Sequence, residues 1–156
     1  MAEQGAKKQS ILALDEALGF NLTRVAVLFR RELMRALADY DMTPEQWQVM
    51  ATLWQGRPLT QTEIVRLTLK DKPSVSRMIA RLERNGWVRK GTDPDDARIT
   101  VIHPTERGRE LRDEVPRRLY EHFAQFFEPF GAERSEQLLA LLKTLRRILG
   151  DDEPTI

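Results

Sequence analysis

The fold is decided by residues 60–103, TQTEIVRLTLKDKPSVSRMIARLERNGWVRKGTDPDDARITVIH. Thr60 and Glu63 stand at the Thr-x-x-Glu spacing of a capping box, which predicts the start of a short helix. After a tight link, Asp71 is placed to cap a second helix over about 72–85. Two helices joined by so short a link indicate a helix-turn-helix.

A hairpin is predicted directly after the second helix. Gly86 suits the left-handed position that ends a helix, and the segments 87–90 and 98–103 have the composition of strands. The stretch 91–97 between them is rich in turn-forming residues and makes the tip. This order predicts a winged helix-turn-helix, in a fold that is mainly α with a small β-hairpin wing.

The second helix has two chemically different faces. At helical spacing its apolar residues gather on one side, namely Val75, Met78, Ile79 and Leu82. Its polar and basic residues gather on the other side, namely Ser74, Arg77, Arg81 and Arg84. A helix with its apolar face inward and its basic face outward fits the major groove of DNA, which is about as wide as a helix.

The DNA-binding residues expected in this region are Thr60, Lys72, Ser74, Ser76, Arg77, Arg81 and Arg84. The sequence leaves open which of the arginines read bases and which contact phosphates. The formal net charge of the chain is only +1, but residues 66–92 hold eight Lys or Arg against two Asp or Glu. Since a nucleic-acid site needs only a local positive potential, this cluster supports DNA binding.

Amphipathic helices are predicted on both sides of the winged region. Apolar residues, many of them leucine or phenylalanine, recur at helical spacing in residues 20–40, 105–130 and 133–149. One small winged domain cannot cover that much apolar surface, so a symmetric partner is expected.

The expected organisation is one unit over residues 1–156. Dimerisation helices at 10–40 and 105–149 enclose the winged helix-turn-helix at 43–103. Pro116 is expected to kink the long C-terminal helix, since proline lacks the N–H that an inner turn needs.

Composition excludes several classes of chemistry. The chain has no cysteine, and its two histidines, His103 and His122, are too far apart in sequence for metal-ligand spacing, so no metal or cofactor is expected. No apolar run is long enough to span a membrane, and residues 1–9 lack the apolar stretch of a secretory signal, which predicts a cytoplasmic protein.

Several short motifs carry a resemblance to a known family. They are PLTQTEI (58–64), SVSRMI (74–79), LE (82–83), GWV (86–88), DPDDAR (93–98) and TERG (105–108). In these motifs the chain resembles the MarR (multiple antibiotic resistance regulator) family, over about residues 20–149. The resemblance implies a homodimer whose first helix and last two helices interleave, and a transcriptional repressor bound to a pseudo-palindromic DNA operator. It also implies release by a small, often aromatic, anionic ligand.

The resemblance also assigns roles to residues of the wing. Arg77 matches the arginine of the family's recognition helix, Asp96 would brace the wing, and Arg98 would approach the minor groove of DNA. Asp95 departs from the family by adding negative charge at the tip, and Ala97 stands where many members carry a basic or small residue. Fewer wing contacts with DNA are therefore expected.

The implied ligand would lie in a crevice between the winged domain and the dimer helices. The candidate lining residues are Phe29, Trp47, Met50, Trp54, His122 and Phe126. Each of them alone is equally compatible with ordinary core packing.

Two functions other than regulation are compatible with parts of the sequence. An enzyme would have to use Asp93, Asp95 and Asp96, which sit on a solvated tip without a histidine partner, so no enzymatic activity is expected. The other alternative is a winged helix that serves as a nonspecific architectural DNA binder or as a protein-interaction module. The arginine face argues against the protein-interaction module, and competition with unrelated DNA separates specific from architectural binding.

Overall fold

A computed structural model describes residues 14–151, which divide after Pro44 into two compact units. Residues 10–13 of the predicted N-terminal dimerisation helix lie outside the described range. The first unit contains one long helix, α2 (Leu18–Leu37), preceded by the 3-10 turn η1 (Leu14–Glu16) and followed by η2 (Ala38–Tyr40). No described helix is both long and apolar enough to cross a membrane.

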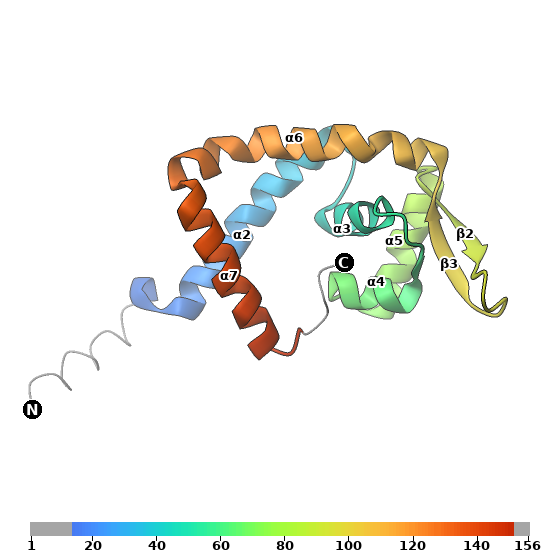
Figure 1. The fold of residues 1–156 in the computed structure, drawn as a ribbon, viewed down its shortest axis with the longest axis horizontal. Helices are drawn as coiled ribbons and strands as arrows, with labels where there is room; N and C mark the ends of the chain where they lie inside the picture. Colours follow the sequence, from blue (N-terminus) through green and yellow to red (C-terminus); the bar gives the residue numbers. More distant parts are fainter. Residues whose placement is uncertain (1–13, 152–156) are drawn as a thin grey trace, which may run out of the picture. The chain divides into compact units, whose positions relative to one another are not determined.

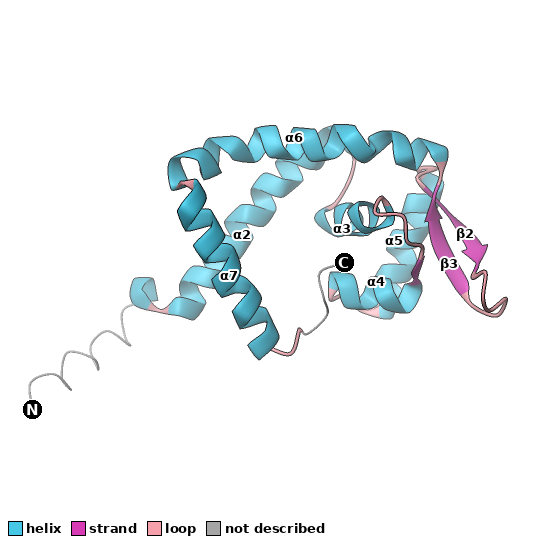
Figure 2. Cartoon of the chain, viewed as in Figure 1, coloured by secondary structure: helices cyan, strands magenta, loops and turns pink. Residues whose placement is uncertain are grey.

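The second unit holds the predicted winged helix-turn-helix and two further helices (Figure 1). Its elements in chain order are α3 (Pro44–Leu53), β1 (Leu59–Thr60), α4 (Gln61–Thr68), α5 (Lys72–Arg84), β2 (Val88–Thr92), β3 (Thr100–Pro104), α6 (Glu106–Phe130) and α7 (Ala132–Ile148). The predicted fold class, mainly α with a small β wing, is confirmed (Figure 2).

The wing is a three-stranded antiparallel sheet in the order β1-β3-β2, not a two-stranded hairpin. The short strand β1 pairs Leu59 with Ile102, so the segment before α4 is joined to the wing. The two long strands also begin later than predicted. Asp93 Oδ1 accepts the backbone N–H groups of Asp95 and Asp96, and these bonds hold residues 93–99 as the tip in place of 91–97.

Apolar residues from every element of the winged region form its core. Those with at most 3% of their surface exposed are Val49, Met50, Leu53, Leu59, Ile64, Val75, Ile79, Leu82, Val88, Val101 and Ile102. Three of these residues lie on the predicted apolar face of α5, where Met78 is half-buried. Burial of each large side chain contributes roughly 1.5–3 kcal/mol, so this core fixes which face of α5 is left outside.

The start of α6 is held against the end of α5 by a small group of polar contacts. Thr105 Oγ1 donates to the carbonyl of Gly86 at 2.5 Å and accepts the N–H of Gly108 at 3.0 Å. The indole Nε1 of buried Trp54 donates to the carbonyl of Gly108 at 2.8 Å. Helix α3, the root of the wing and α6 therefore meet at one point.

Gly108 is required at this junction because the backbone approaches it closely. A Cβ atom at position 108 would lie 2.0 Å from the carbonyl oxygen of Trp87. Gly86 has φ +73°, the left-handed conformation expected after α5. Gly86 of the GWV motif and Gly108 of the TERG motif thus both lie at the junction between the end of α5 and the start of α6.

Helix α6 continues without a break through Pro116. Gly131, with φ +93°, separates α6 from α7, which has no buried residue in this chain. The exposed apolar side chains of α7 include Leu138, Leu139, Leu141 and Leu142.

Substitution of Gly108 tests the junction. Gly108→Ala should destabilise the fold by about 1–3 kcal/mol or more, because the added methyl group collides with backbone that cannot move aside easily. Chemical denaturation followed by circular dichroism measures this loss. Gly19→Ala is the matched control, since its Cβ meets nothing within 4 Å in α2 and should be neutral or slightly stabilising. Equal stability of the two variants would contradict the role given to Gly108.

Candidate nucleic-acid interface

The candidate recognition helix is α5, whose N-terminus is capped as the sequence predicted. Asp71 Oδ1 accepts the N–H of Ser74 at 2.8 Å, and Pro73 lies in the first turn. The backbone and side-chain hydrogen bonds from Ser74 hold the pKa of Asp71 below its usual value. The carboxylate is thus charged at neutral pH, and it fixes the direction in which α5 begins.

The basic face of α5 lies outside, opposite the buried apolar face. Ser76, Arg77 and Arg84 are exposed, and Ser74 and Arg81 are half-buried. Lys72, at the first position of the helix, is also exposed. Every α5 residue that the sequence predicts to contact DNA is therefore at least partly accessible to solvent.

Arg77 is held in place before any DNA is present. Its Nη2 donates to Ser74 Oγ at 3.0 Å, and Ser74 Oγ donates to Asp71 Oδ2 at 2.9 Å. Ser74 is therefore part of a chain that orients Arg77, in addition to capping the helix. A guanidinium ordered in this way loses less side-chain entropy when it contacts a base or a phosphate.

Gln61 joins the two helices of the helix-turn-helix, and the sequence did not indicate this role. Its Nε2 donates to Ser76 Oγ at 2.5 Å and, at 3.4 Å, to the carbonyl of Lys72. Because Ser76 Oγ accepts this bond, its own hydroxyl hydrogen remains available to an acceptor on DNA. The two residues are 15 positions apart, and no periodicity in the sequence relates them.

Thr60 begins α4 with the complete capping box expected from the sequence. Its Oγ1 accepts the N–H of Glu63 at 3.2 Å, and its own N–H donates to Glu63 Oε2 at 2.7 Å. Burial raises the pKa of Glu63, but the hydrogen bonds from Thr60 and the Arg57 guanidinium outweigh burial and lower it overall. Thr60 thus has an internal role beside the DNA contact predicted for it.

Asp96 and Arg98 form a paired group at the tip of the wing. Asp96 Oδ1 accepts the backbone N–H of Arg98 at 3.0 Å and its Nε at 3.1 Å, and Oδ2 accepts Nη2 at 3.2 Å. The side-chain bonds from Arg98, followed by the backbone bond, lower the pKa of Asp96. The Arg98 side chain is 90% exposed, so Asp96 holds a guanidinium that projects into solvent.

The wing is tied to the recognition helix by an ion pair. Lys90 Nζ, on β2, lies 2.9 Å from Glu83 Oε2, on α5. The pair is partly exposed, so it contributes little to stability, but it links strand β2 of the wing to α5.

The six residues predicted to line a ligand crevice are placed in three groups. Trp47 and Trp54 on α3 make an edge contact with ring centroids 5.7 Å apart, and Met50 beside them is fully buried. His122 and Phe126 on α6 have ring centroids 6.0 Å apart. Phe29 lies on α2 in the first unit and is 44% exposed.

This geometry defines a winged helix-turn-helix DNA-binding protein. A basic recognition helix with a capped N-terminus lies beside a wing with an exposed arginine at its tip. Residues 40–99 match the family model for the MarR family. Over these residues the chain is similar to the MarR family.

The curated relatives to which the chain is similar are transcriptional regulators. HTH-type transcriptional regulator TtmR of Methylorubrum extorquens (strain PA1) is 29% identical over 120 residues, which cover 71% of this chain and 62% of TtmR. The chain thus spans less than two thirds of that relative. HTH-type transcriptional regulator PecS of Dickeya dadantii (strain 3937) is 28% identical over 131 residues, covering 82% of this chain and 79% of PecS.

Solved structures share the fold. CouR from Rhodococcus jostii RHA1 bound to p-coumaroyl-CoA has a TM-score of 0.78 at 24% identity, covering 92% of this chain and 99% of that chain. The transcriptional repressor CouR bound to a 23-mer DNA duplex has a TM-score of 0.79 at 25% identity, covering 86% and 96%.

Proposed function

We propose that this protein is a homodimeric repressor that binds a pseudo-palindromic operator and is released by a small aromatic or anionic ligand. The observation that carries the DNA-binding part is the preordered basic face of α5, in which Asp71, Ser74 and Arg77 form one hydrogen-bonded chain. In the proposed complex α5 lies in the major groove. Arg81 and Arg84 extend the contact along the same helix, and Arg98 of the wing approaches the minor groove.

The CouR structure on a DNA duplex supports this arrangement, because that repressor has the same fold. Thr60 and Lys72 lie at the starts of α4 and α5, where backbone N–H groups and side chains can contact phosphates. Asp96 acts indirectly, by holding Arg98.

Arg77→Ala tests the recognition helix. The variant should bind the operator about 1–3 kcal/mol more weakly and keep its fold, because Arg77 is exposed and lies off the core face. A fluorescence titration with a labelled duplex from the promoter beside the protein's own gene measures the affinity. Arg117→Ala on α6 removes the same charge outside α5 and the wing and should have little effect. Unchanged operator affinity of Arg77→Ala would refute the assignment.

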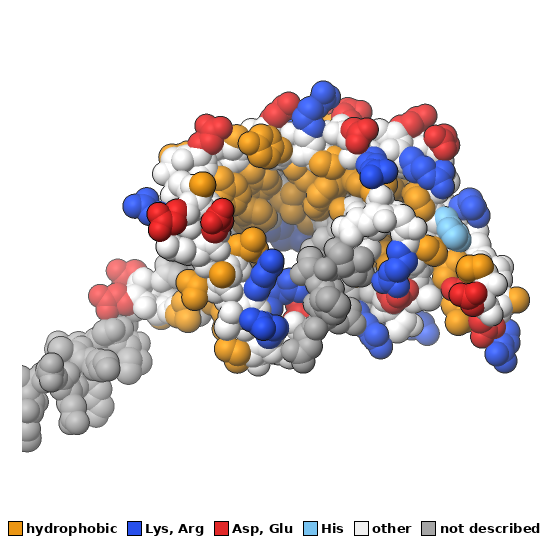
Figure 3. All heavy atoms as spheres, viewed as in Figure 1, with side chains coloured by type: hydrophobic (Ala, Val, Ile, Leu, Met, Phe, Trp, Pro, Cys, Tyr) orange, Lys and Arg blue, Asp and Glu red, His pale blue; other side chains and the backbone are white. Residues whose placement is uncertain are grey.

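The dimer is proposed because the last two helices expose apolar side chains. Figure 3 shows hydrophobic side chains gathered on α6 and α7. They include Phe126, Phe127 and Phe130 on α6 and Leu138, Leu139, Leu141 and Leu142 on α7, each at least 38% exposed. In α2, Val25, Val27 and Met34 are more than half exposed. An apolar surface of this kind is typical of a symmetric interface, which would also bring two recognition helices to a palindromic site.

Charges placed on α7 test the dimer. Leu138 and Leu142 are four residues apart and share one helix face, so Leu138→Glu with Leu142→Glu should give monomers or aggregates. Light scattering after size-exclusion chromatography measures the mass. Gln137→Glu on the same helix adds a negative charge at a polar position and should remain dimeric. A stable dimer of the double variant would place the interface elsewhere.

The ligand is proposed from the aromatic residues of α3 and α6 together with the CouR structure in which that protein holds p-coumaroyl-CoA. Phe29, Trp47, Met50, Trp54, His122 and Phe126 remain the predicted lining residues. Because the chain has no cysteine, release of DNA cannot use thiol oxidation. A ligand that favours the form unable to bind DNA by about 1–3 kcal/mol would weaken the complex roughly 5- to 150-fold.

Salicylate-like aromatic acids test this ligand proposal. Their addition should quench tryptophan fluorescence and weaken operator binding over the same concentration range, and Phe126→Ala should shift both curves together. Mild peroxide serves as the control for oxidation and should have no effect on DNA binding. If peroxide released the DNA while no aromatic acid did, ligand sensing would be refuted.

The alternative function is nonspecific architectural binding, which the same basic face would allow. Excess unrelated DNA in the titration separates the two. A repressor keeps its operator complex, whereas an architectural binder loses it in proportion to the competitor.

A further inference from the structure

The outward face of α5 holds one exposed alanine between two exposed arginines. The inner face of this helix is defined by its buried residues, Val75, Ile79 and Leu82. At about 100° per residue, Arg77, Ala80 and Arg84 all lie within about 50° of the opposite direction. All three are exposed, whereas Ser74 and Arg81 are half-buried. Ala80 therefore belongs to the most outward surface of α5.

Ala80 lies about one turn from each of the two arginines. It follows Arg77 by three positions and precedes Arg84 by four, and side chains at these spacings are neighbours on a helix surface. At a rise of about 1.5 Å per residue, it is about 4.5 Å from Arg77 and about 6 Å from Arg84 along the helix axis. Because a methyl group is far shorter than an arginine side chain, the backbone of α5 can approach another surface most closely at Ala80.

The side chains on this face offer hydrogen-bond donors and a methyl group, but no carboxylate. Arg77 is oriented by the 3.0 Å bond from its Nη2 to Ser74 Oγ. The one acidic residue of α5, Glu83, is half-buried, and its Oε2 lies 2.9 Å from Lys90 Nζ of the wing. In the major groove, arginine reads the acceptors of guanine, carboxylates read the amino group of cytosine, and small apolar side chains contact the C5-methyl group of thymine. The composition of this face thus favours guanine and thymine over cytosine.

We propose that Ala80 is a specificity-determining residue, whose methyl group packs against the C5-methyl group of a thymine between the contacts of Arg77 and Arg84. This inference rests on the proposed function, because it requires α5 to lie in the major groove. It adds to the recognised sequence a base that the arginines do not identify, since a guanidinium selects acceptors and not a methyl group. A symmetric dimer reads one such thymine in each half-site.

Replacement of thymine by uracil tests the contact, because uracil lacks only the C5-methyl group. The full-length protein first selects its site from a library of random duplexes. Each thymine of the selected duplex is then replaced by uracil in turn, and the affinity is measured by fluorescence titration. At one thymine in each half-site, uracil should weaken binding by wild type roughly fourfold, which is the change expected for one buried methyl group.

Ala80→Gly completes a double-mutant cycle with the uracil duplex. The variant should bind the thymine duplex roughly fourfold more weakly than wild type, and it should bind the thymine and uracil duplexes equally. Ala140→Gly, at an exposed position of α7, carries a similar cost in helix propensity and should distinguish the two duplexes as wild type does. Circular dichroism melting confirms that the three proteins are folded.

The outcomes separate this inference from the proposed function. If no sequence were enriched, specific operator binding would be refuted, and the thymine contact with it. A selected site whose affinity does not change with uracil at any thymine would overturn the thymine contact alone. Sensitivity to uracil that persists in Ala80→Gly would assign the methyl contact to another residue, and would overturn the role of Ala80 as well.

Discussion

The close approach of Gly108 to the carbonyl of Trp87 is the contact on which the arrangement of the winged region depends. No side chain fits there, since even a Cβ atom would lie 2.0 Å from the carbonyl oxygen. The same glycine accepts the indole N–H of Trp54, and Thr105 holds both Gly108 and Gly86. Helix α6 therefore starts at a fixed distance from α3 and from the wing. If α6 carries the dimer contacts, this junction transmits the dimer geometry to the recognition helix.

The residues proposed to contact DNA share one property, which is that neighbouring side chains hold them in place. Asp71 and Ser74 hold Arg77, Gln61 holds Ser76, and Asp96 holds Arg98. Such bonds are individually weak at an exposed surface. In the proposed complex they would reduce the number of side-chain conformations lost on binding, and so would contribute more to affinity and specificity than to folding stability.

The local features of this fold could be predicted from the sequence because each depends on residues close together in the chain. The capping box at Thr60 and Glu63, the cap at Asp71 and the left-handed Gly86 belong to this class, and all three are confirmed. The strand β1 was missed because two residues carry no periodic signal, and its existence depends on pairing with β3 some forty residues later.

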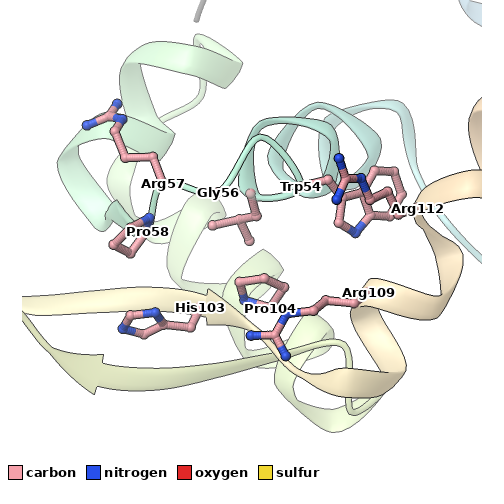
Figure 4. A pocket seen from close by; sticks show the side chains of 9 residues that line it. Trp54, Gly56, Arg57, Pro58, His103, Pro104, Arg109 and Arg112 are labelled. Atoms are coloured by element: carbon pink, nitrogen blue, oxygen red, sulfur yellow. The ribbon is translucent and has the colours of Figure 1, made fainter.

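Contacts between segments that are far apart in the chain also could not be predicted from the sequence. The bond from Gln61 to Ser76 depends on the turn between α4 and α5, where Leu69 adopts an unusual left-handed conformation with φ 53°. The resemblance to a family marked Thr105 and Gly108 as a motif, but only the structure shows that they fasten α6 to the wing. A pocket lined by the end of α3, the link to β1, the end of β3 and the start of α6 likewise joins four segments that no single motif contains (Figure 4).

The acidic tip of the wing is the feature that most opposes DNA binding, and its geometry reduces that opposition. Asp93 accepts two backbone N–H groups, and Asp96 accepts both the backbone and the guanidinium of Arg98. Two of the three carboxylates therefore serve to shape the tip and to present Arg98, whose side chain is 90% exposed. Asp95 offers only its backbone N–H to this network, so its carboxylate is the one whose charge the tip does not offset. In the proposed complex, repulsion between Asp95 and phosphates would favour a wing that meets DNA through Arg98 alone, and it would leave most of the sequence reading to α5.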